Sequence, residues 1–171
     1  MSALRVRGES PADVAAARAL LAAAFGQEAE ALLVDRLRAA GALSVALVAL
    51  AGEEVVGHVA FSPLEIGGAD GAGRWVGLAP LAVAPPHQGR GIGSRLVEEG
   101  LAACRLAGAR LVCVLGDPHY YRRFGFATAR DRGLLCEYEV PPEHFMALPL
   151  AREPDAGPAG LVRYRPEFAG L

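Results

Sequence analysis

The chain has 171 residues, of which 53% are hydrophobic and 21% charged, and its formal net charge is −2 at pH 7. This length and composition predict one folded domain over residues 1–171 and exclude a disordered chain. The small net charge argues against a nucleic-acid-binding or membrane-binding protein, because both partners require a strongly basic surface.

Targeting signals and metal-binding motifs are both missing from the sequence. The first eight residues contain no apolar stretch, and Asp13 and Arg18 interrupt the alanine-rich segment that follows. The three cysteines, Cys104, Cys113 and Cys136, form no CxxC pair, which argues against a zinc site or a disulfide framework. We therefore expect a cytoplasmic protein with no metal site.

Strand and helix patterns interleave along the chain. Apolar periodicity and capping residues predict helices over 11–25, about 28–40, about 91–107 and 118–124. Alternating or continuously apolar runs predict strands over 4–7, 45–50, 55–61, 75–83, 111–115, 134–140, 146–150 and 161–164. Glycine-rich 67–73 and polar 151–160 are predicted to be loops only. This order predicts an α/β or α+β fold.

A glycine-rich turn, Gln88-Gly-Arg-Gly-Ile-Gly-Ser-Arg95, joins the buried strand 75–83 to the helix that follows it. Each of the three glycines lowers helix stability by about 1 kcal/mol relative to alanine, so their presence needs a reason. Without β-carbons, backbone N–H groups can approach a ligand closely, and the helix N-terminus adds about half a positive charge. The turn is therefore a candidate anion site, with Arg90 and Arg95 adding charge.

The residues of the turn do not match two common phosphate-binding motifs. All 17 basic residues are arginine, so the lysine of a P-loop is missing. A dinucleotide fingerprint would need a third glycine where the chain has Ser94. The remaining pattern is Gln88-x-x-Gly91-x-Gly93, and its alternative explanation is an ordinary strand-to-helix turn with glycines for packing.

The surroundings of the turn resemble the GNAT superfamily of acetyltransferases. The resemblance rests on Leu78-Ala-Pro-Leu-Ala-Val83, the glycine turn with its helix, the next strand, and Tyr121-Arg-Arg-Phe-Gly-Phe126. It is strongest over about 75–126. The phrases Ala60-Phe-Ser-Pro63 and Leu115-Gly-Asp-Pro118 and the tail after Gly160 look like the YhbS-like branch of N-acetyltransferases.

The resemblance implies a fold and a donor site. The fold is a mixed, mostly antiparallel central sheet with splayed central strands, flanked by helices. Acetyl-CoA is the implied co-substrate, with the backbone of Leu81 and Val83 binding the amides of its pantetheine arm. The turn and first helical residues would wrap the diphosphate of coenzyme A: Gln88, Gly89, Arg90, Gly91, Ile92, Gly93, Ser94 and Arg95.

The resemblance also implies a catalytic tyrosine. The general acid of the family corresponds to Tyr121, four residues before Gly125, and neighbouring Tyr120 is the next choice. A phenol can protonate the departing thiolate at neutral pH, whereas a packed core tyrosine is the alternative. No carboxylate lies on strand 75–83 to act as base, which leaves three candidates open: His58, Asp117 and His119.

The sequence therefore predicts an N-acetyltransferase that moves an acetyl group from acetyl-CoA to a primary amine by direct attack. The acceptor is a small molecule, a peptide or a protein amine. Transfer of a larger acyl group, or a non-catalytic acyl-CoA-binding module, are the alternatives. The sequence does not distinguish a monomer from a homodimer.

Overall fold

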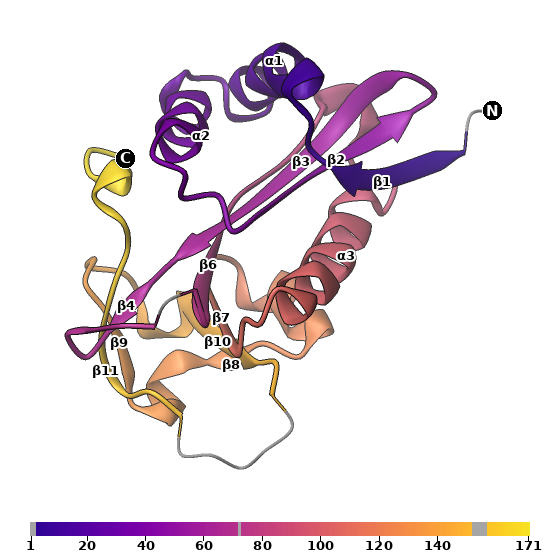
Figure 1. Ribbon diagram of the computed structural model, residues 1–171. Helices are drawn as coiled ribbons and strands as arrows, with labels where there is room; N and C mark the ends of the chain where they lie inside the picture. The colour runs from indigo at the N-terminus through magenta and orange to yellow at the C-terminus, as the bar shows by residue number, and fades with distance from the viewer. Residues whose placement is uncertain (1–2, 72, 152–156) are drawn as a thin grey trace.

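The computed structural model describes residues 3–71, 73–151 and 157–171 and contains two sheets (Figure 1). The larger sheet has the strand order β1-β2-β3-β6-β7-β10-β8, and the smaller one β5-β4-β11-β9. The strands of the larger sheet are β1 (Leu4–Gly8), β2 (Val45–Ala51), β3 (Glu54–Pro63), β6 (Trp75–Val83), β7 (Leu111–Leu115), β8 (Ala127–Thr128) and β10 (Phe145–Pro149). Those of the smaller sheet are β4 (Glu65–Ile66), β5 (Ala69–Asp70), β9 (Leu134–Cys136) and β11 (Gly160–Arg163).

The larger sheet is mixed but mostly antiparallel, which confirms the predicted fold class. Strands β1, β2, β3 and β6 pair with antiparallel neighbours, and so do β7, β10 and β8. The two central strands β6 and β7 are parallel, because α3 (Ile92–Leu106) connects them as a crossover. The C-terminal strands β10 and β11 both pair within the chain.

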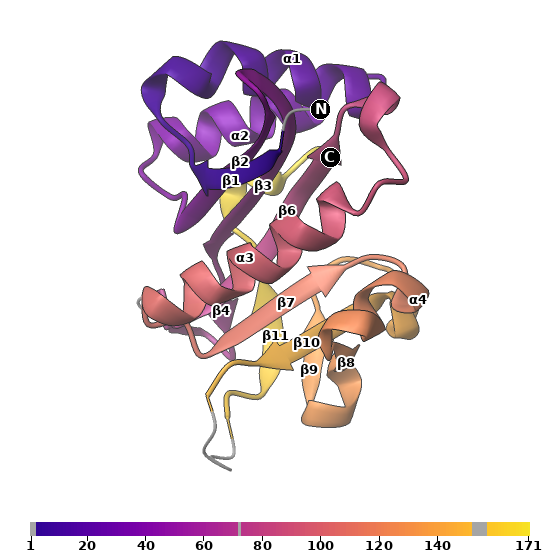
Figure 2. The same ribbon diagram turned by 90° about the vertical axis from the view of Figure 1, so that its right-hand side faces the viewer.

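Helices cover both faces of the larger sheet (Figures 1 and 2). Helices α1 (Val14–Phe25) and α2 (Ala29–Ala39) lie on one side, and α3 lies on the other. Helix α3 packs closely on the sheet because glycines lie where the helix and the strands touch. A β-carbon at Gly57 would lie 2.7 Å from Leu96 Cδ1, and one at Gly100 would lie 2.5 Å from Phe61 Cε1.

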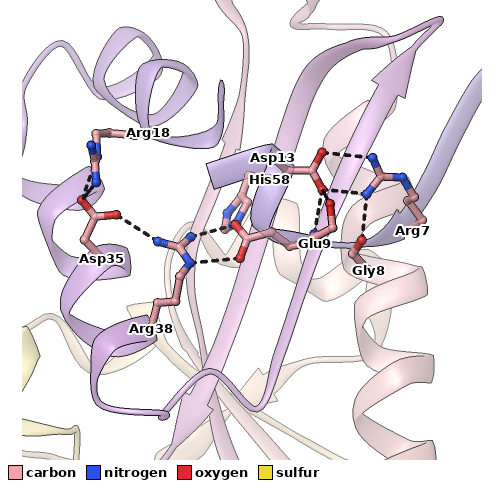
Figure 3. A network of polar contacts seen from close by, with 9 residues as sticks. Arg7, Gly8, Glu9, Asp13, Arg18, Asp35, Arg38 and His58 are labelled. Atoms are coloured by element: carbon pink, nitrogen blue, oxygen red, sulfur yellow. Dashed lines mark hydrogen bonds and ion pairs between the residues drawn. The ribbon is translucent and has the colours of Figure 1, made fainter. Parts of the chain in front are cut away.

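The connection between β1 and α1 is fixed by a buried carboxylate. Asp13 accepts hydrogen bonds from Arg7 Nη1 at 2.7 Å and from the Ser10 N–H at 2.7 Å (Figure 3). The Arg7 hydrogen bond is the main reason that the pKa of Asp13 lies well below its ordinary range. Asp13 therefore stays ionised and anchors the first helix on the sheet edge.

The sequence prediction was wrong at several short strands. The stretch 67–73, expected to be only a loop, contributes β5, which pairs with β4 across a turn at Gly67 and Gly68, both with positive φ. The predicted strand 134–140 ends at Cys136, and β8 was not expected at all. Two-residue strands are too short to show any period, so β5 depends on the Gly67-Gly68 turn and β8 on its pairing with β10. Part of the predicted loop 151–160, namely 152–156, lies outside the described residues.

Candidate coenzyme site at the splayed strands

The central strands separate halfway along their length. The ladder between β6 and β7 ends at the pair Leu78 and Val114, although β6 continues to Val83. At the same point the register between β6 and β3 shifts, so that Ala79 and Pro80 together oppose Ala60. This extra residue is a bulge, and it turns the end of β6 away from β7. The predicted splay is therefore present.

Backbone groups on β6 face the gap that the splay opens. The Ala84 N–H donates to the Val56 carbonyl of β3 at 2.9 Å, so Ala84 points toward β3. Backbone direction alternates along a strand, so the N–H and C=O groups of Leu81 and Val83 point away from β3 and into the gap. The Val83 carbonyl accepts a hydrogen bond from the Gln88 side chain at 3.0 Å.

The glycine turn leads directly into the N-terminus of α3. Gly89 and Gly91 have φ values of 76° and 82°, a region that favours glycine, and Gly91 is the N-cap. The first bond of the helix runs from the Arg95 N–H to the Gly91 carbonyl at 3.1 Å. The N–H groups of Ile92, Gly93 and Ser94 therefore precede the helical ladder and remain available to a ligand. A β-carbon at Gly89 or Gly91 would meet no atom within 4 Å, so this surface is open.

The side chains of Arg90 and Arg95, the two arginines of the turn, have different surroundings. Arg90 is exposed and has no ion-pair partner among the described residues. Arg95 instead binds Glu99 Oε2 at 2.8 Å and the Leu4 carbonyl at 2.7 Å along the flank of α3. An i to i+4 spacing made this pairing available. The structure thus leaves Arg90 at the turn and directs the Arg95 side chain elsewhere.

Tyr121 is buried where β7 ends. It belongs to α4 (Pro118–Tyr121), and its side chain packs so closely on Gly116 that a β-carbon there would lie 2.4 Å from Tyr121 Cε2. The residue is 9% exposed, and its hydroxyl has no hydrogen-bond partner among the described residues. Burial, and secondarily the nearby Tyr120, raises the pKa of Tyr121 to about 12. The phenol is therefore protonated throughout the neutral range.

Tyr120 faces the other way from its neighbour. Its hydroxyl oxygen lies 3.4 Å from Ser94 Oγ, at the N-terminus of α3. The two tyrosines therefore occupy different places: Tyr121, the first choice for the general acid, lies beside β7, and Tyr120, the second choice, lies beside the glycine turn.

His58 is fully buried in a network of charged residues (Figure 3). Its Nε2 lies 3.0 Å from Glu9 Oε1, and Glu9 also pairs with Arg38 of α2 at 2.8 Å. Burial raises the pKa of Glu9, but the hydrogen bonds from His58 and Arg38 outweigh it and hold that pKa below its ordinary value. No sequence signal pointed to Glu9, because 49 residues separate it from His58. His58 has no exposed surface with which to meet a solvent-borne amine.

The other two base candidates lie at the start of α4. Asp117 is the N-cap of this helix, and its Oδ1 accepts the His119 N–H at 2.9 Å. Both residues are exposed. Within residues 3–71, 73–151 and 157–171, no three His, Cys, Asp or Glu side chains gather in a way that could hold a metal ion.

A large pocket lies elsewhere on the molecule, at the start of β6 and β7. Its volume is about 480 Å³, and its lining includes Arg74, Trp75, Arg110 and Arg132. Arg74, Trp75 and Arg110 precede or begin the two parallel strands, whereas the glycine turn follows the end of β6. The pocket is thus separate from the splay.

Comparisons with known proteins agree with this geometry. The sequence profile of the family described as acetyltransferase (GNAT) domain matches residues 5–129. The chain is 42% identical over 164 residues to a protein of Escherichia coli K12 named uncharacterized N-acetyltransferase YhbS, covering 95% of this chain and 97% of that one. None of the helices in the described part of the chain is long and apolar enough to cross a membrane.

Two solved structures have the same fold. A GNAT-family N-acetyltransferase (YhbS) from Escherichia coli in complex with CoA superimposes with a TM-score of 0.91 at 41% identity, covering 98% of this chain and 93% of the other. A GNAT-family acetyltransferase from Brucella melitensis in complex with acetyl-CoA gives a TM-score of 0.81 at 40% identity, covering 98% and 99%. The family profile, the relatives and the splayed sheet together show that this chain belongs to the GNAT family of acetyltransferases.

Proposed function

We propose that residues 1–171 form one N-acetyltransferase domain that transfers an acetyl group from acetyl-CoA to a primary amine. The observation that carries the proposal is the free N-terminus of α3, placed beside the open half of the gap between β6 and β7. Solved relatives at 40% and 41% identity contain acetyl-CoA and CoA. Both observations favour an acyl-CoA donor.

The donor would occupy the turn and the gap together. The backbone N–H groups from Gly89 to Ser94 suit a diphosphate, since they point out of a helix N-terminus and carry its partial positive charge. The N–H groups of Leu81 and Val83 face the gap, where an extended pantetheine arm can pair with β6 as an added strand. Such pairing would hold the thioester at a fixed position, and orienting two reactants can lower a barrier by roughly 7–11 kcal/mol.

The reaction follows from this arrangement. The neutral amine nitrogen attacks the thioester carbonyl carbon, a C–N bond forms, the C–S bond breaks, and the sulfur leaves as a thiolate. The nitrogen loses a proton as the amide forms, and the thiolate takes one up. Tyr121 is the group that we place at the sulfur.

The burial of Tyr121 determines whether it would transfer a proton to the leaving sulfur or only donate a hydrogen bond to it. Burial raises the pKa of Tyr121 to about 12, so the phenol keeps its proton at neutral pH. Tyr121 would therefore stabilise the leaving sulfur by donating a hydrogen bond, with the amine as the eventual source of the proton. A hydrogen bond to a charged group contributes about 1.5–3 kcal/mol.

A second candidate function is a non-catalytic acyl-CoA sensor. It is favoured by one feature of the sequence, namely that β6 carries no carboxylate to act as a base. The three free thiols, Cys104, Cys113 and Cys136, suit a reducing compartment, so we place either activity in the cytoplasm.

Binding and turnover assays separate these functions. We expect acetyl-CoA at 100 times its Kd to stabilise the folded protein by roughly 2.7 kcal/mol, while NADH and ATP leave thermal unfolding unchanged. A panel of small amines and lysine-containing peptides, assayed for release of free CoA thiol, should then contain at least one acceptor. Stabilisation by acetyl-CoA without acetylation of any amine would favour the sensor, and stabilisation by NADH or ATP instead would contradict both functions.

A further inference from the structure

The Tyr120 side chain lies against the first turn of α3, directly after the glycine turn. Its hydroxyl lies 3.4 Å from Ser94 Oγ and 3.0 Å from the point where a β-carbon of Gly93 would stand. The same point is 3.7 Å from Val83 Cγ2 and 3.9 Å from Leu81 Cδ2. A hydroxyl, the first turn of α3 and two gap-facing residues of β6 thus converge where the turn meets the gap.

Arg123 is stacked on the outer side of this tyrosine. Its guanidinium carbon lies 4.6 Å from the centroid of the Tyr120 ring, a cation–π contact. Arg123 is exposed and makes no ion pair with any described carboxylate. The ring is further held edge-on by Tyr121 and Phe124, with centroid distances of 5.1 and 5.4 Å. The cation–π contact thus places an unpaired guanidinium on the ring whose hydroxyl lies beside Ser94.

We propose that Tyr120 and Arg123 form a second wall of the phosphate site and bind the phosphates of the coenzyme beside the N–H groups of α3. Tyr120 donates its hydroxyl hydrogen to a diphosphate oxygen, and Ser94 holds this hydroxyl in place. Arg123 neutralises phosphate charge, a role that the pairing of Arg95 with Glu99 leaves open on the α3 side. The inference rests on the proposed function and extends it from backbone donors to two side chains of α4 and the turn after it.

The two neighbouring tyrosines then have different roles. Tyr120 belongs to binding, because its hydroxyl is at the phosphate end of the gap. Tyr121 belongs to the chemical step, because its ring packs on Gly116 at the end of β7. A change at Tyr120 should therefore alter affinity, and a change at Tyr121 should alter turnover.

Calorimetric titration of the full chain tests this division. We expect Tyr120→Phe and Arg123→Gln each to weaken binding of acetyl-CoA about tenfold. With acetyl-pantetheine, which has no phosphate, both variants should bind like the wild type. Acetyl 3′-dephospho-CoA, which lacks the 3′-phosphate, shows which phosphate Arg123 contacts. If Arg123→Gln still binds this analogue more weakly than the wild type does, Arg123 contacts the diphosphate. If the two proteins bind it equally, Arg123 contacts the 3′-phosphate, and either result supports the proposal.

Arg122→Gln is the matched control, since it removes the same charge from the adjacent exposed position without touching the Tyr120 ring. It should leave acetyl-CoA affinity unchanged. Equal affinity of the wild type, Tyr120→Phe and Arg123→Gln for acetyl-CoA would overturn the inference, as would an equal loss in Arg122→Gln or a loss that persists with acetyl-pantetheine. A wild type that fails to bind acetyl-CoA at all would instead contradict the proposed function. Equal melting temperatures confirm that all variants fold.

Discussion

Replacing Gly93 with aspartate is expected to abolish acetyl-CoA binding while the protein still folds. The φ angle of Gly93 lies outside the left-handed region, so the backbone accepts a side chain there. The new β-carbon would stand 3.0 Å from the Tyr120 hydroxyl, and the carboxylate would meet the diphosphate. Like charges brought together at a binding site cost several kcal/mol, so we expect Kd to rise by at least about 100-fold in a calorimetric titration.

Two variants isolate the cause of this loss. Gly8→Asp adds the same charge on β1, where a β-carbon would meet nothing within 4 Å, and should leave binding unchanged. Gly93→Ala adds the β-carbon without the charge and should give an intermediate loss. If a folded Gly93→Asp protein bound acetyl-CoA as tightly as the wild type, the diphosphate could not lie at the start of α3.

The second large effect is expected at Tyr121. Tyr121→Phe removes only the hydroxyl from a buried ring, so packing against Gly116 is retained. If that hydroxyl donates to the leaving sulfur, kcat should fall about 10²-fold with almost no change in the Kd of acetyl-CoA. Steady-state turnover and calorimetric binding of the variant measure the two quantities separately. Unchanged kcat would remove Tyr121 from the chemical step.

The raised pKa of Tyr121 gives this experiment a pH control. Because its pKa is raised to about 12, the Tyr121 phenol remains mostly protonated at pH 10, where an ordinary tyrosine would be half ionised. The ratio of wild-type to Tyr121→Phe kcat should therefore stay constant between pH 7 and about 10.5. A ratio that declines toward one above pH 9.5 would mean that the hydroxyl is more exposed in the working enzyme than in this structure.

The central part of the fold could be predicted because its signals are local. The continuously apolar run 75–83 is β6, the glycines that follow mark the start of α3, and the period of the apolar residues gives that helix its buried face. By contrast, β8 and β4 pair with β10 and β11, which are distant in the sequence, and two-residue strands carry no pattern of their own.

Some features of the candidate site could likewise be predicted from the sequence, and others could not. Loop glycines with special φ values are visible in a sequence, so Gly89 and Gly91 could be proposed as an anion cradle. Side-chain directions are not visible, because they follow from packing. The sequence could not show that Arg95 binds Glu99, that Tyr120 and Tyr121 face different elements, or that His58 pairs with Glu9 across 49 residues.

A crystal structure with bound CoA tests the account most directly. We predict that diphosphate oxygens lie within hydrogen-bonding distance of the N–H groups of residues 89–94, with the pantetheine arm along β6 between Leu81 and Val83. The account is contradicted if the diphosphate instead occupies the arginine-lined pocket at Arg74 and Arg110, or if the gap between β6 and β7 stays closed around protein side chains.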